Sequence, residues 1–190
     1  MRNCLLVYLH GFNSSPQSHK AQVMQRYAKE EGVEFACPAL PPLADDAIRI
    51  AEQVIHGKKS ACLIGSSLGG FYATYLAEKH GLKAVLINPA IDPHVGLRAY
   101  LGPQKNLHTG QPYELTEAHL AQWKKLFVPR VTPRRYLLLV ETGDEVLDYR
   151  RAVERYAGAE QVVVQGGDHS LQSFPQHLPR ILEFSRAPSV

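Results

Sequence analysis

Short apolar runs that alternate with helix-length amphipathic segments constrain the fold of this chain more than any other feature. Six runs have the length and composition of buried strands: 3–9, 34–37, 60–65, 83–88, 135–141 and 160–165. Helical segments lie between most of them, near 16–31, 43–56, 67–80, 147–157 and 171–185. Apolar strands that are separated by helices are typical of a parallel sheet with both faces covered. We therefore predict an α/β fold, a three-layer α/β/α sandwich with about six mostly parallel strands.

The composition fits one ordinary globular domain that spans 1–190. The chain has 190 residues, of which 45% are hydrophobic, and its formal net charge is only +3. It contains no run of Lys and Arg of the kind that contacts nucleic acid. The N-terminal "CLLVYL" is too short for a signal peptide, and no apolar stretch approaches about 20 residues. The three cysteines are far apart in the sequence, with no C-x-x-C pair. We expect a soluble, cytoplasmic protein with no nucleic-acid or membrane partner, and the sequence leaves its oligomeric state open.

Residues 91–134 interrupt the alternation, because they separate two strands by more than one crossover helix requires. Only "ELTEAHLAQWKKLF" within this segment is clearly helical. Ligands of open α/β sheets bind beyond the carboxyl ends of the strands, so the segment is either a lid or an elaborate loop. Residues 91–135 contain seven basic and three acidic residues, a net charge of +4 that leaves −1 for the rest. This charge indicates a solvated basic face or a preference for anionic substrates.

The stretch "IGSSLGG" lies between an expected strand and an expected helix. A nucleophile on a tight strand-to-helix turn has strained backbone angles, and the residues two before and two after it then lack room for a side chain. Gly65 and Gly69 occupy those positions around Ser67, whereas Ile64 and Leu68 would occupy them around Ser66. The spacing therefore predicts that Ser67 is the nucleophile. The alternative is a turn of glycine and serine without chemical function.

A serine nucleophile needs a base and a group that orients the base. His169 follows the last expected strand on a glycine-rich loop, and we predict that it is the general base. The acid is expected after the strand at 135–141, where Asp144 is our first choice and Asp148 the alternative. Asp148 can equally cap the following helix. Asp168, which is adjacent to the base in the sequence, is interpreted as a residue that shapes the loop.

A tetrahedral intermediate also needs two hydrogen-bond donors for its oxyanion. We predict that the backbone N–H groups of Leu68 and Phe12 form this oxyanion hole. Gly11 permits the turn after the first strand, and His10 is expected to brace the loop. The reaction requires no metal and no cofactor.

With these residues the chain resembles the α/β-hydrolase superfamily, and within it the small YqiA/YcfP-like bacterial esterases. The similarity extends over "YLHGFNSSP", "GSSLGGFYATYLAE", "NPA", "TGDEVLDY" and "GGDHS". The resemblance implies a minimal hydrolase sheet that lacks the first two strands of the superfamily. It also implies a triad of Ser67, Asp144 and His169, with carboxylesterase activity on small acyl esters and on acyl-CoA thioesters.

Other functions remain open at this point. A peptidase or a perhydrolase can use the same fold and triad, because specificity depends on the pocket. A protein without catalysis that keeps the fold to bind a ligand is a further alternative. The sequence leaves the natural substrate, the acyl chain length and the pathway undetermined.

Overall fold

A computed structural model of the chain describes residues 4–58 and 60–188, so Asn3 of the first expected strand lies outside the described residues. Its centre is one sheet of six parallel strands in the order β2-β1-β3-β4-β7-β8. The strands are β1 (Leu5–Leu9), β2 (Phe35–Ala36), β3 (Ala61–Ser66), β4 (Lys83–Ile87), β7 (Tyr136–Glu141) and β8 (Glu160–Val164). Each falls within one residue or two of its predicted range. The predicted parallel α/β sheet is therefore confirmed.

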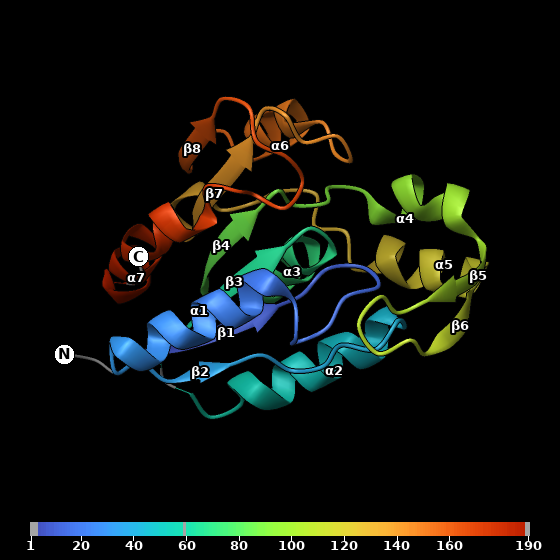
Figure 1. Cartoon of the computed structure of the whole chain (residues 1–190), viewed down its shortest axis with the longest axis horizontal. Helices are drawn as coiled ribbons and strands as arrows, with labels where there is room; N and C mark the ends of the chain where they lie inside the picture. Colours follow the sequence, from blue (N-terminus) through green and yellow to red (C-terminus); the bar gives the residue numbers. More distant parts are fainter. Residues whose placement is uncertain (1–3, 59, 189–190) are drawn as a thin grey trace.

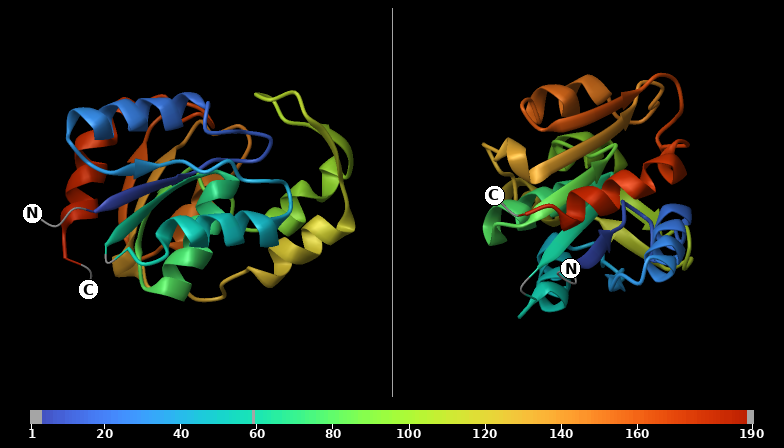
Figure 2. Two further views of the ribbon diagram at one scale, coloured as in Figure 1. Left: turned by 90° about the horizontal axis from the view of Figure 1, so that it is seen from below. Right: turned by 90° about the vertical axis from the view of Figure 1, so that its left-hand side faces the viewer.

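Helices cover both faces of this sheet, which gives the predicted three layers (Figures 1 and 2). Residues of α1 (His19–Glu30) and α7 (Leu178–Arg186) pack into one core cluster, on one face. Residues of α2 (Ala44–Ile55), α3 (Leu68–His80) and α6 (Tyr149–Arg155) pack into the other. Of the helices that the described residues form, none has both the length and the apolar composition needed to cross a bilayer.

The segment 91–134 lies beyond the carboxyl ends of the strands, on the right of Figure 1. It forms α4 (Pro93–Gly96), a short 3₁₀ turn, an antiparallel pair of β5 (Gly102–Lys105) and β6 (Pro112–Leu115), and α5 (Glu117–Lys125). The pair β5–β6 was not predicted, because Pro103 and Pro112 argue against strands. The pair stands outside the main sheet, and two strands paired only with each other tolerate the N–H that each proline lacks.

Specific contacts attach this segment to the rest of the molecule. The Trp123 side chain on α5 is fully buried, and its Nε1–H donates to the Tyr72 hydroxyl on α3 at 2.7 Å. The Tyr113 hydroxyl on β6 donates to Asn13 Oδ1 at 2.6 Å. The Phe12 ring packs edge-on against Trp123, with ring centroids 6.5 Å apart. The segment therefore forms a wall over the loop that follows β1.

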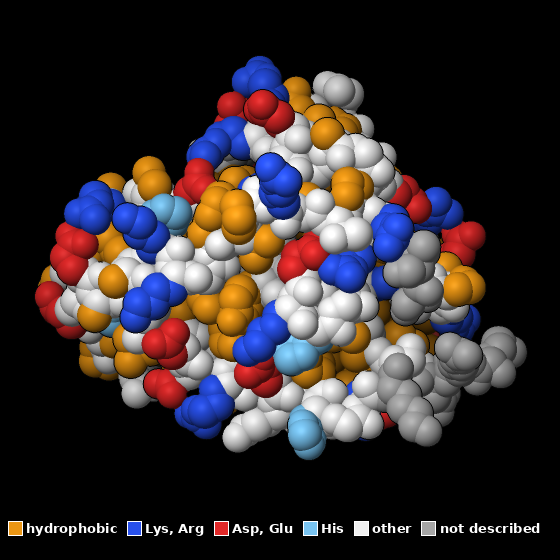
Figure 3. All heavy atoms as spheres, turned by 180° about the vertical axis from the view of Figure 1, so that it is seen from behind, with side chains coloured by type: hydrophobic (Ala, Val, Ile, Leu, Met, Phe, Trp, Pro, Cys, Tyr) orange, Lys and Arg blue, Asp and Glu red, His pale blue; other side chains and the backbone are white. Residues whose placement is uncertain are grey.

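Charged residues of this segment are partly neutralised by ion pairs. Arg98 Nη1 lies 2.7 Å from Glu117 Oε1 within the segment, and Arg135, the residue that follows it, has its Nη1 2.6 Å from Glu78 Oε2. Seen from behind, the surface intersperses basic and acidic side chains among apolar ones (Figure 3). The basic residues of 91–135 are therefore distributed over ion pairs and solvent.

Candidate active site

Ser67 directly follows β3, at the carboxyl edge of the sheet and at the start of α3. Its backbone has φ 55° and ψ −120°, a strained region for a residue with a side chain. A Cβ added to Gly65 would lie 2.3 Å from the carbonyl oxygen of Gly69, and one added to Gly69 would lie 1.9 Å from that of Leu9. Both predicted glycine positions therefore have no room for a side chain.

Backbone hydrogen bonds hold the strained serine in place. The Ser67 N–H donates to the carbonyl of Ile87, at the end of β4, at 3.0 Å. The Ser67 carbonyl accepts from the N–H groups of Gly70, at 2.9 Å, and Ala90, at 3.0 Å. The turn is thus tied to the neighbouring strand as well as to its own helix, and such ties can maintain a strained residue.

The structure brings Ser67, His169 and Asp144 together from three different strand ends. His169 Nε2 lies 3.1 Å from Ser67 Oγ, and His169 Nδ1 lies 2.8 Å from Asp144 Oδ2. A carboxylate can only accept, so Nδ1 carries the proton and Nε2 accepts from the serine hydroxyl. The Asp144 side chain is 1% exposed and that of His169 is 23% exposed. The base is therefore accessible from outside while the acid is not.

Asp144 is held as a carboxylate by several donors. The N–H groups of Val146 and Leu147 donate to its Oδ1, each at 2.8 Å. Burial by itself raises the pKa of the Asp144 carboxyl, but the hydrogen bonds from His169 and Leu147 outweigh it and bring the pKa below its ordinary value. Asp148, the alternative acid, is the N-cap of α6 and accepts from the Arg150 N–H at 3.1 Å. Asp168 shapes its loop through the Ser170 N–H at 2.8 Å.

The loop after β1 lies directly against the serine. A Cβ on Gly11 would lie 3.2 Å from Ser67 Cβ, so the backbone of residues 10–12 approaches the nucleophile closely. The structure records no acceptor for the N–H groups of Phe12 and Leu68 among the described residues. The two predicted oxyanion donors are therefore free to donate to a ligand.

His10 stabilises this loop through contacts of both its ring nitrogens. It is 4% exposed, and its Nε2 accepts from the Leu40 N–H at 3.0 Å while Nδ1 lies 3.1 Å from the Gly11 carbonyl oxygen. An Nδ1–H donor and an Nε2 acceptor describe a neutral imidazole. Burial lowers the pKa of His10, which favours the same neutral form. Its two ring nitrogens connect the loop after β1 to the loop after β2.

Glu141, at the end of β7, is a site residue that our reading of the sequence missed. Its side chain accepts from the N–H groups of Asp168, Gln172 and Ser173 at 2.8, 3.0 and 2.8 Å. Glu141 is 1% exposed, and although burial raises the pKa of its carboxyl, the hydrogen bonds from Ser173, Asp168 and Gln172 lower it overall. This buried carboxylate therefore fixes the loop that carries His169.

Asn88, the first residue of the "NPA" motif, supports the same loop from β4. Its Nδ2 donates to the carbonyls of Asp168 and His169 at 3.1 and 3.2 Å, and its Oδ1 accepts from the Glu141 N–H at 3.1 Å. The available sequence signals were an acidic residue at the end of one strand and an asparagine directly after another. Neither signal identifies the distant loop that it holds.

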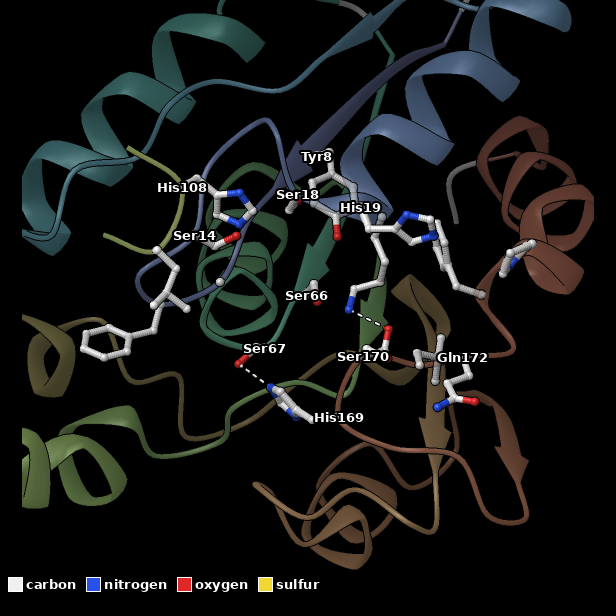
Figure 4. Close-up of a pocket in the computed structure, with 17 residues that line it drawn as sticks. Tyr8, Ser14, Ser18, His19, Ser66, Ser67, His108, His169, Ser170 and Gln172 are labelled. Atoms are coloured by element: carbon white, nitrogen blue, oxygen red, sulfur yellow. Dashed lines mark hydrogen bonds between the residues drawn. The ribbon is translucent and has the colours of Figure 1, made fainter. Parts of the chain in front are cut away.

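Two cavities meet at Ser67 and His169. The larger, which we call the polar cavity, has a volume of about 530 Å³, and more of its lining residues have polar side chains than apolar ones. The polar ones include Ser14, Ser18, His19, His108 and Gln172, and apolar side chains such as Leu107, Leu171 and Phe174 also line it (Figure 4). The smaller has a volume of about 330 Å³, and much of its lining is apolar side chains of Phe12, Leu68, Ile91, Leu97, Tyr100 and Leu147. The segment 91–134 thus provides a large part of the apolar cavity.

Solved structures share this fold. A candidate hydrolase from Agrobacterium vitis S4 superimposes with a TM-score of 0.80 at 21% identity, over 97% of this chain and 88% of that one. Mouse alpha/beta hydrolase domain-containing protein 10 gives a TM-score of 0.75 at 16% identity, over 96% and 89% of the two chains. Est1E from Butyrivibrio proteoclasticus gives 0.72 at 16% identity, over 95% and 86%. The fold is that of the α/β hydrolases, as the motifs indicated.

Sequence relatives cover nearly the whole chain. A protein of Serratia proteamaculans (strain 568) named UPF0227 protein is 22% identical over 97% of this chain and 100% of its own length. A UPF0227 protein of Pasteurella multocida (strain Pm70) is 25% identical over 96% and 99%. The model of the uncharacterised protein family UPF0227 matches residues 5–186. The chain therefore belongs to the UPF0227 family.

Proposed function

We propose that this protein is a serine hydrolase that cleaves carboxylic esters through an acyl-enzyme intermediate. The observation that carries the proposal is the hydrogen-bonded series from Ser67 Oγ through His169 to the buried Asp144 carboxylate. The strained backbone of Ser67 supports it. Such strain destabilises the folded state, and it is typical of nucleophiles on a tight strand-to-helix turn. The hydrolase names of two structural neighbours agree with this chemistry.

In the proposed mechanism, Ser67 Oγ attacks the ester carbonyl while His169 Nε2 accepts the hydroxyl proton. Asp144 keeps Nδ1 protonated and stabilises the positive charge that forms on the ring. The N–H groups of Phe12 and Leu68 donate to the oxyanion. His169 then protonates the leaving alcohol, and a water that it deprotonates releases the carboxylic acid from Ser67. Glu141 and Asn88 act only by positioning the loop of His169.

The apolar cavity suits the hydrocarbon part of an acyl group. It opens on Ser67 and His169, and Leu97 and Tyr100 of the segment 91–134 form part of its wall. We assign to this segment the role of a cap that selects acyl chains. Acyl-CoA thioesters are a second substrate class in this proposal, since their acyl part has the same chemistry and the family resemblance implies them.

Labelling with a fluorophosphonate probe tests the assignment of the nucleophile. We expect the wild-type protein to be labelled and the Ser67→Ala variant to be unlabelled, with kcat on an activated butyrate ester reduced by about 10³-fold or more. The neighbouring Ser66→Ala variant is the matched control and should keep the label. Normal turnover by Ser67→Ala would refute the proposal, and an unlabelled wild-type protein would favour a ligand-binding protein without catalysis.

A further inference from the structure

Lys20 is a cation in the lining of the cavity that contains the proposed nucleophile, and the mechanism above does not use it. It lies in the first turn of α1 and is partly buried, in the lining of the polar cavity that also contains Ser67 and His169. One of its three N–H donors is used by the carbonyl of Ser170, at 2.7 Å from Nζ. A cation in the first turn of a helix opposes the helix dipole, and that turn of α1 has no acidic residue. The local fold therefore does not explain the choice of lysine.

Nearby carboxylates do not pair with Lys20. Asp168 accepts from Ser170 and Gln172, Glu141 accepts from three backbone N–H groups, and Asp144 accepts from His169 and two more. No ion pair of Lys20 is present among the described residues. Burial lowers the pKa of Lys20, while Asp168, Asp144 and Glu141 raise it from a distance. The Lys20 ammonium thus has N–H donors that can still bond to a ligand.

The rest of the polar cavity has the same character. The polar residues that line it include two further histidines besides His169, four serines besides Ser67, and Gln172, and none of the described lining residues is Asp or Glu. The Ser18 Oγ atom is buried and has no hydrogen-bond partner in the described part of the chain. Figure 4 shows His19 and His108 across the cavity from His169, with Ser18 between them. Donors and cations without a carboxylate are the chemistry that recognises an anion.

We propose that the polar cavity binds an anionic group, a carboxylate or a phosphate, carried by the alcohol portion of the ester, and that Lys20 is its ionic partner. This inference rests on the proposed ester hydrolysis. It follows from the two cavities that meet at Ser67, since a hydrocarbon acyl chain in the apolar cavity directs the other substituent of the carbonyl into the polar one. Lys20 is then a residue that determines specificity.

Three butyryl esters with matched acyl groups test the inference: those of ethylene glycol, of glycolate and of glycol phosphate. We expect the wild-type protein to prefer at least one anionic ester over the neutral one by about tenfold or more in kcat/KM, mainly through KM. The preference for glycolate or for glycol phosphate identifies the anion. Lys20→Gln should lower the ratio of anionic to neutral kcat/KM about tenfold, and Lys20→Arg should keep most of it. Lys29→Gln, at the exposed end of the same helix, is the control and should leave the ratio unchanged.

Equal kcat/KM for all three esters in the wild-type protein would overturn the inference. An equal loss on anionic and neutral esters in Lys20→Gln would also overturn it, because Lys20 would then only fix the loop through Ser170. The dissociation constants of the same esters for Ser67→Ala, with and without Lys20→Gln, are measured by calorimetry. These constants test the anion preference independently of turnover, so that absence of hydrolysis contradicts the proposed function alone.

Discussion

The strand ends that carry the triad and the segment 91–134 that covers it are built in opposite ways. Around Ser67, backbone groups pack so closely that a glycine Cβ has no room. The buried Glu141 carboxylate accepts from N–H groups of the loop that carries His169. The segment 91–134 consists of short elements, and Val95, Tyr100 and Leu107 on it are 62%, 52% and 81% exposed. The strand ends therefore tolerate little change, whereas the segment 91–134 can vary its side chains. This difference separates chemistry from substrate choice within one small domain.

A pair of glycine variants should show the difference most strongly. We expect Gly69→Ala to prevent folding or to lower the free energy of unfolding by more than about 4 kcal/mol, because its Cβ would lie 1.9 Å from the Leu9 carbonyl oxygen. Gly96→Ala is the counterpart in α4, where no atom lies within 4 Å of the added Cβ and φ is −65°. Its effect on the free energy of unfolding should stay within about 1 kcal/mol. Urea unfolding measures both, and similar losses would contradict the comparison.

Glu141→Gln should have the next largest effect. Both carboxylate oxygens of Glu141 accept hydrogen bonds, whereas the glutamine amide has only one acceptor oxygen. We therefore expect the free energy of unfolding at pH 7 to fall by about 1–3 kcal/mol. The kcat on a butyrate ester should fall about tenfold or more with little change in KM, because His169 is displaced. Glu154→Gln, at an exposed position of α6, is the control, and its free energy of unfolding should change by no more than about 0.5 kcal/mol.

The pH dependence of the unfolding free energy, compared between the wild-type protein and Glu141→Gln, sharpens this prediction. The folded pKa of Glu141 lies below its ordinary value, so its contribution to stability is complete above the unfolded pKa of about 4.3 and is lost as pH falls through the folded pKa. The difference in unfolding free energy between wild type and Glu141→Gln should therefore shrink from pH 6 to pH 3. A constant difference would mean that the charge of Glu141 is unimportant.

Leu97→Trp should have the smallest effect on the fold and a selective effect on substrates. Leu97 lines the apolar cavity, and a larger ring there removes space for about two methylene groups, each worth about 0.8 kcal/mol. We expect the ratio of kcat/KM for an octanoyl ester over a butyryl ester to fall about tenfold. Leu101→Trp is the control in the same segment, because Leu101 is absent from the described lining of that cavity. Equal changes in both variants would show that the segment does not select acyl chains.

The sheet and the proposed triad were predictable because each depends on local sequence. Buried strands are continuous apolar runs, and the residues that follow their carboxyl ends meet at one edge of a parallel sheet. Ser67, Asp144 and His169 each follow such a strand, and the structure places them within hydrogen-bond distance. The glycine spacing also distinguished Ser67 from Ser66, since it reflects steric contact within one turn.

Other parts depend on contacts between segments far apart in the sequence. Glu141 holds a loop 27 to 32 residues later, and no pattern within its own strand identifies that partner. Lys20 reaches Ser170 across 150 residues, so this cation in the cavity of the nucleophile lies outside the basic segment that composition indicated. The pair β5–β6 was missed because each of these short strands contains a proline, which argues against a strand in the sequence.

The order of the strands also affects how the protein is made. Synthesis delivers β1 to β4 first. Among them β1, β3 and β4 are neighbours in the sheet, and they form the complete serine turn, including the bond from Ser67 N–H to the Ile87 carbonyl. The base arrives 102 residues after the nucleophile, on the loop that follows the edge strand β8. A growing chain therefore contains an assembled serine turn without a base to activate it. The proposed hydrolytic activity begins only when the loops that carry Asp144 and His169 have docked.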